Sequence, residues 1–104
     1  MNKCIIQLWE ESERGWGVRP DGCSLHLNKE VRDFYIDGMY LNRSNLSVPN
    51  EYDRPIGIPI SCLISDGLFE NLSQIGTIRL FEMEKNNLIK MGEIVYWIIQ
   101  LYPM

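Results

Sequence analysis

The pattern of apolar and polar positions predicts a series of strands. Residues 3–10 carry apolar groups on both faces, which is typical of a central strand. Further strands are predicted at residues 58–65, 77–83 and 93–101. The last of these remains open, because residues 88–101 also fit a helical spacing. The alternating stretches therefore predict a sheet to which distant parts of the chain contribute.

The stretch from Gly15 to Leu27 predicts a hairpin. Pro20 presets φ for the first corner of a turn, and Asp21 and Gly22 suit the positions that follow. We expect this turn to lift Arg19 and Asp21 to its tip, with Trp16 and His26 on the flanking strands. The charged residues 10–15 before it are predicted to form a loop, and residues 54–57 repeat the Arg-Pro-x-Gly pattern.

Two segments have helical spacing. Asn28 is a good N-cap for a helix over residues 29–41, where Val31, Phe34 and Tyr35 fall on one stripe. Ser65 or Asp66 can begin a second helix, which Gly76 is placed to end.

The segments between these elements are polar. Residues 42–57 are predicted to form a long loop, and residues 84–87 a turn. Together the elements predict one α+β domain over residues 1–104: an antiparallel sheet of about five or six strands with two helices on one face.

Composition narrows the classes of partner. The net charge of −4 disfavours nucleic acid, because phosphate binding needs clustered Lys and Arg. The N-terminus lacks the apolar run of a signal peptide, and no apolar run approaches the roughly 20 residues that span a bilayer. Three cysteines without a pairing pattern indicate free thiols. We expect a cytoplasmic protein without membrane contact.

Few residues point to catalysis. Cys23 and His26 lie three positions apart on a predicted strand and should face opposite ways, so we expect no metal and no cofactor. His26 could serve acid–base chemistry with Asp21, Glu51 or Asp53, but nothing in the sequence fixes their geometry. The sequence therefore favours a protein without enzymatic activity.

A binding surface is the stronger hypothesis. Arg, Trp and Tyr dominate interface hot spots, and such residues gather in or beside the two Arg-Pro-x-Gly stretches. We expect Arg19 and Arg54 to share one face with the aromatic rings between them. Two alternatives stay open: that these residues grip an anionic small molecule or nucleotide, or that they only support the fold. The candidate binding residues are Arg14, Trp16, Arg19, Asp21, His26, Tyr52 and Arg54.

The stretch from Trp16 to His26 resembles short uncharacterised proteins of bacteria and their phages, which are similar again near residues 48–55. The resemblance brings no catalytic residue with it. It implies a small accessory protein that binds a host protein, such as an anti-CRISPR or other anti-defence inhibitor.

The C-terminal stretch bears on assembly. Residues 94–99 are apolar on both faces and cannot all face one small core, which indicates either a central strand or a subunit interface. Of the two we favour the interface and expect a homodimer.

Overall fold

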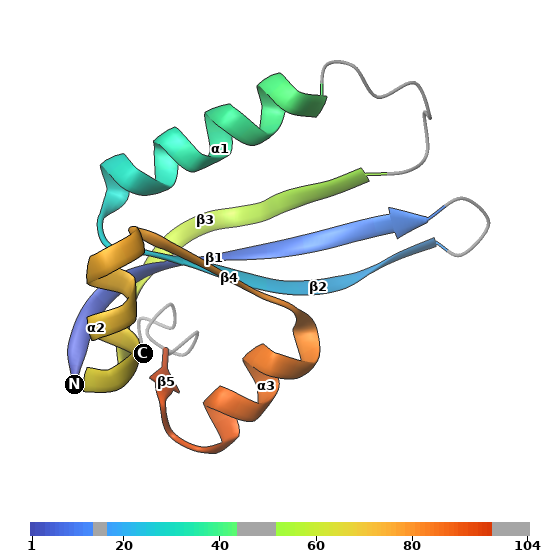
Figure 1. Ribbon diagram of the computed structural model, residues 1–104. Helices are drawn as coiled ribbons and strands as arrows, with labels where there is room; N and C mark the ends of the chain where they lie inside the picture. Colours follow the sequence, from blue (N-terminus) through green and yellow to red (C-terminus); the bar gives the residue numbers. More distant parts are fainter. Residues whose placement is uncertain (14–16, 44–51, 97–104) are drawn as a thin grey trace, which may run out of the picture.

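The structure is a computed structural model that describes residues 1–13, 17–43 and 52–96. Within these ranges five strands form one antiparallel sheet with three helices packed on it (Figure 1), which confirms the predicted α+β class. The elements in chain order are β1 (Asn2–Glu13), β2 (Gly17–His26), α1 (Lys29–Arg43), β3 (Tyr52–Ile64), α2 (Asp66–Ile75), β4 (Thr77–Leu80), α3 (Glu82–Lys90) and β5 (Ile94–Val95).

The sheet is built around its first strand. The strand order is β4-β2-β1-β3-β5, so the central position predicted for the N-terminal strand is confirmed. β1 pairs with β2 from Ile5 to Glu13 and with β3 from Asn2 to Ser12. Both neighbours of β1 therefore depend on it for register.

Helices cover both faces of the sheet, rather than the single face predicted. Cys4 and Ile6 of β1 lie in a buried core cluster, against which α2 and α3 pack through Leu72 and Leu88. Side chains alternate along a strand, so Gln7 and Trp9 point the other way, toward α1. Figure 1 shows α1 on one side of the strands, with α2 and α3 on the other.

The starts of the first two helices agree with their predicted caps. The Asn28 side-chain oxygen accepts a hydrogen bond from the Val31 N–H at 2.9 Å, and α1 begins at Lys29. Ser65 accepts from the Leu68 N–H at 3.4 Å, and α2 ends before Gly76. These short-range signals were sufficient because a cap involves only neighbouring residues.

Two predicted connections are wrong, because strands occupy them. β1 continues through the expected charged loop to Glu13. Residues 19–22 lie within β2 rather than in a turn, and Arg19 and Pro20 pair with Glu11 and Glu10. The register shifts opposite Trp9, where β2 holds one more residue than β1.

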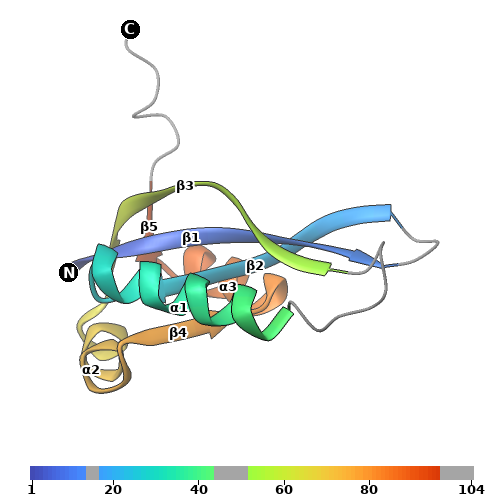
Figure 2. The same ribbon diagram turned by 90° about the horizontal axis from the view of Figure 1, so that it is seen from above.

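The second Arg-Pro-x-Gly stretch is also strand, in place of the end of the predicted long loop. β3 begins at Tyr52, and its register against β1 shifts between Ile60 and Ile56. Figure 2 shows the resulting curvature of β3 beside the straighter β1.

The end of the chain departs most from prediction. The polar residues expected as a turn lie in the helix α3, where the Glu84 carboxylate accepts a hydrogen bond from the Phe81 N–H at 3.1 Å. Of the predicted last strand, over residues 93–101, the structure describes as strand the short β5, which pairs with Leu63 and Ile64. Residues 97–101 of that strand lie outside the described ranges.

Candidate functional site

A chain of four hydrogen-bonded side chains lies between the sheet and α1. The Trp9 indole N–H donates to Ser24 Oγ at 2.8 Å, and Ser24 Oγ lies 2.6 Å from His26 Nε2. On the other side of the ring, His26 Nδ1 lies 2.9 Å from Thr77 Oγ1. These residues come from β1, β2 and β4, so the network fixes three strands against one another.

The network sets the state of His26. An indole can only donate, so Ser24 accepts from Trp9. The neutral imidazole of His26 has one donor and one acceptor nitrogen, so it donates to one of Ser24 and Thr77 and accepts from the other. Burial, aided by the Arg32 charge and opposed by Asp33, lowers the pKa of His26 from 6.5 to about 4. The imidazole is neutral at physiological pH.

This serine–histidine pair does not form a catalytic centre. Both side chains are 0% exposed, so a substrate has no access to the Ser24 hydroxyl. The Trp9 indole bonds the Ser24 hydroxyl, and the Tyr35 ring contacts the His26 ring, so both members of the pair are in contact with neighbouring aromatic side chains. His26, a candidate binding residue, is therefore part of the protein's interior support.

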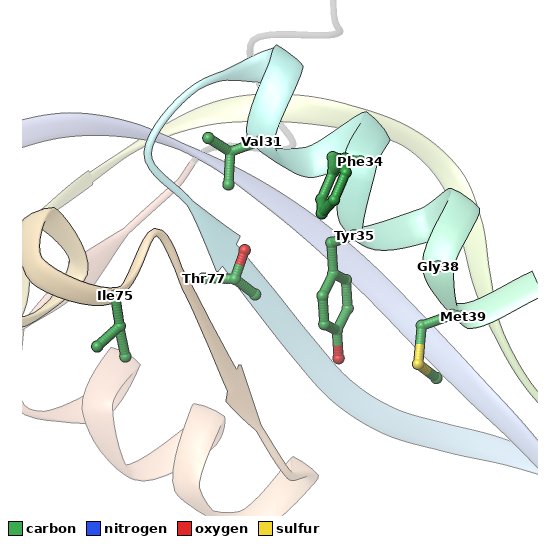
Figure 3. A pocket seen from close by; sticks show the side chains of 7 residues that line it. All are labelled: Val31, Phe34, Tyr35, Gly38, Met39, Ile75 and Thr77. Atoms are coloured by element: carbon green, nitrogen blue, oxygen red, sulfur yellow. The ribbon is translucent and has the colours of Figure 1, made fainter. Parts of the chain in front are cut away.

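An open apolar groove lies directly above this network. Its volume is about 360 Å³, at the small end of the roughly 300–1,000 Å³ of ligand sites. Figure 3 shows α1 forming one wall, with Ile75 and Thr77 opposite. Thr77 joins the groove to the buried network through its bond to His26. The lining residues are Val31, Phe34, Tyr35, Gly38, Met39, Ile75 and Thr77.

The groove exposes large apolar side chains to solvent. Phe34 is 82% exposed and Ile75 is 67% exposed, on opposite walls. Burying such a side chain contributes about 1.5–3 kcal/mol of free energy. In the folded chain alone these two side chains do not contribute it, because they remain exposed. A partner that covers the groove would therefore gain from burying these side chains.

Two acidic residues of α1 lie beside Phe34, whereas the cations Lys29 and Arg32 of the same helix are ion-paired with Asp33. Glu30 and Asp37 precede and follow Phe34 by four and three residues, so they are its neighbours on the helix surface. Both carboxylates are exposed. None of the residues that line the groove carries a positive charge.

The predicted binding residues do not gather at this groove. Arg19 is ion-paired with Glu11, and Arg54 with Glu10 at 2.7 Å. Glu10 and Glu11 are consecutive on β1, so the two pairs lie on opposite faces of the sheet. The single face expected for Arg19 and Arg54 is therefore wrong.

Three of the remaining predicted residues have side chains outside the description. Arg14 and Trp16 lie outside the described residues. Tyr52 begins β3, and its side chain lies outside the description.

Asp21 has a partner that the sequence did not indicate. Arg79 on β4 donates to Asp21 at 2.9 Å and to Asp53 at 3.1 Å, while its guanidinium lies 4.9 Å from the centre of the Trp9 ring. Burial and the neighbouring Asp53 carboxylate raise the pKa of Asp21. Asp21 is thus part of a half-buried cluster that joins β2, β3 and β4, rather than the tip of a turn.

The cysteines lie in the core. Cys23 belongs to the core cluster and His26 to the network beneath α1, so the predicted opposite orientation is confirmed. Burial raises the pKa of the Cys23 thiol to about 12. Cys4 and Cys62 are opposite each other on β1 and β3, with their sulfurs 3.3 Å apart. Within the described ranges, no three His, Cys, Asp or Glu side chains form a metal-binding group.

The comparisons add no relative. Protein-family models, curated proteins and solved structures were all compared with the chain, and none matches it. The resemblance to short phage proteins remains a prediction. The described helices are all too short or too polar to cross a lipid bilayer.

Proposed function

We propose that this protein acts by binding another protein through the apolar groove, without enzymatic activity. The observation that carries the proposal is the pair of exposed side chains, Phe34 and Ile75, on facing walls. Aromatic and aliphatic groups in a concave site form typical hot spots, because a partner can desolvate them fully. Thr77 and the network beneath it hold the floor in place.

The charges favour a protein over an anionic small molecule. An anion at this groove would meet Glu30 and Asp37 without a cation in the lining. The arginines proposed to hold a nucleotide are ion-paired with β1 carboxylates on opposite faces. Binding of a nucleotide by Arg19 and Arg54 would therefore require both ion pairs to open.

The resemblance suggests the finer proposal. A small accessory protein of a phage or mobile element would act in the cytoplasm by binding a host protein. Inhibition of a host defence complex, including a CRISPR nuclease, is the activity we propose for that contact.

The test compares capture by two matched pairs of variants. Phe34→Ser and Ile75→Ser remove groove contacts, whereas Met83→Ser and Ile58→Ser remove equally exposed apolar groups elsewhere. Proteins captured from host extract are quantified for each variant, and the affinity of the leading protein is then measured with purified components. We expect the groove variants to weaken binding about thirtyfold or more, and the controls to retain it.

A second arm addresses the anionic ligand. Nucleotides are screened by thermal shift against the wild type, Arg19→Ala and Arg54→Ala. Two results together would favour nucleotide binding over protein binding. A nucleotide would stabilise the wild type but neither variant, and the Phe34→Ser and Ile75→Ser variants would capture host proteins as well as the wild type does.

A further inference from the structure

The dimensions of the groove match one face of a helix. Its α1 wall runs from Val31 to Met39, a rise of about 12 Å at roughly 1.5 Å per residue. Apolar anchors at positions i, i+4 and i+7 of a partner helix span about 10.5 Å by the same rise. An amphipathic helix lying along α1 would therefore fit three apolar anchors within the length of this wall.

The charge around the groove selects among such helices. Glu30 and Asp37 flank Phe34 on α1, and the facing end of α2 presents the uncharged Asn71 and Gln74. Lysine or arginine beside the apolar anchors would meet these carboxylates, whereas acidic residues would be repelled.

A second copy of the chain is a poorer fit. Each copy carries a net charge of −4. The helix α2 also brings Asp66 in its first turn and has no basic residue in its last turn. Docking α2 of a second copy beside Glu30 and Asp37 would bring like charges together.

We propose that the groove takes a basic amphipathic helix of a partner protein. This inference rests on the proposed function and narrows it to one chemical class of partner. The apolar anchors supply the affinity, and the Lys or Arg residues set the orientation and the discrimination against acidic helices.

The experiment is a selection from a defined helical peptide library. Each peptide has about 18 residues, because shorter isolated helices are marginal in water. Leu is fixed at i, i+4 and i+7, and the flanking positions are randomised among Lys, Glu and Gln. Peptides that bind the wild-type protein are sequenced, and their affinities are measured for Phe34→Ser and for the Glu30→Lys/Asp37→Lys double variant.

We expect the selected peptides to be rich in Lys at the flanking positions. Binding should fall about thirtyfold in Phe34→Ser and about tenfold in the charge-reversed variant. Selected peptides that need Phe34 but show no excess of Lys overturn this inference and leave protein binding by the groove intact. Peptides indifferent to Phe34 and Ile75, or no selection at all, count against the groove itself.

Analytical sedimentation of the protein alone tests whether a second copy of the chain binds in the groove. A dimer that Phe34→Ser dissociates would place a second copy in the groove and overturn the proposed partner class. A species whose mass is the same in both proteins agrees with it.

Discussion

The imidazole of His26 receives one hydrogen bond and donates another, with no contact to solvent. In this arrangement the neutral ring donates at one nitrogen and accepts at the other. Protonation would place a buried positive charge near Arg32 and turn the accepting nitrogen into a donor. Protonation of His26 therefore destabilises the hydrogen-bonded network that joins β1, β2 and β4.

We expect the stability of the protein to depend on pH through this residue. The unfolded chain binds the proton with a pKa of 6.5 and the folded chain with a pKa of about 4, so the unfolded state holds more protons between these values. The free energy of unfolding should therefore fall as the pH decreases, by about 2 kcal/mol between pH 7 and pH 5.

Urea unfolding at several pH values measures this effect, with His26→Gln as the control. The variant is expected to be less stable at pH 7, because it breaks the network, but to lose about 2 kcal/mol less between pH 7 and pH 5. Parallel pH profiles for the two proteins would assign the change to other groups.

At the scale of elements, two strands owe their shape to Arg-Pro-x-Gly stretches that do not turn the chain. Gly22 and Gly57 have φ values of +74° and +69°, and each lies where a strand holds extra residues against β1. Pro and Gly suit turns and bulges alike. Whether such a stretch forms a turn or a bulge depends on the strand that pairs with it, and the local sequence does not identify that strand.

The two glycines provide a matched pair of substitutions. A Cβ at Gly22 would lie 2.0 Å from the Leu80 carbonyl oxygen, whereas a Cβ at Gly57 meets nothing within 4 Å. We expect Gly57→Ala to cost about 1–2 kcal/mol from its φ value alone. Gly22→Ala should cost clearly more, because the junction of β4 and α3 must also move. Thermal unfolding of both variants checks the order, and equal losses would contradict it.

The cysteines opposite each other on β1 and β3 allow a second test at this scale. Oxidation by diamide, which takes up the two thiol hydrogens, is expected to join Cys4 to Cys62 and leave Cys23 reduced. The bond should raise the free energy of unfolding by about 2–4 kcal/mol. Peptide mapping identifies the linkage, and Cys62→Ser provides the control. A linkage to Cys23, or none, would show that the strands do not hold this pair in register.

The elements also show where sequence reasoning succeeds. The beginnings of α1 and α2 were predicted because Asn28 and Ser65 cap them through bonds to residues three positions away. The helix α3 was missed because few of its residues are apolar and its polar start is typical of a turn. Its stability comes from packing Leu88 and Ile89 on a sheet whose strands are distant in sequence.

At the scale of the whole molecule, the position of α1 decides which side chains become a surface. The helical spacing placed Val31, Phe34 and Tyr35 on one stripe, yet among residues 29–39 of this helix the buried residue is Ile36, at 7% exposed. Arg32 bonds Gln7 at 2.6 Å and turns that side of the helix to the sheet. The candidate site could not be predicted, because an exposed and a buried Phe34 give the same helical spacing.

This orientation predicts a contrast between neighbouring residues. Phe34→Ala should change the free energy of unfolding by less than about 0.5 kcal/mol, as expected for an exposed position. Ile36→Ala should cost about 2–4 kcal/mol, as expected for a buried one. Chemical denaturation of both proteins measures the difference, and a large loss in Phe34→Ala would mean that the aromatic ring supports the fold.

The central place of the first strand has a consequence for the newly made chain. β1 ends at Glu13, but its second neighbour ends only at Ile64, about fifty residues later. At a synthesis rate of about 5–20 residues per second, β1 waits roughly 3–10 seconds for that neighbour. During this interval β1 lacks one of its two neighbours, and Ile6 lacks the helices α2 and α3 that later cover its face of the sheet. The nascent chain therefore presents an unpaired edge of its central strand until β3 leaves the ribosome, and such an edge favours aggregation and binding by a chaperone.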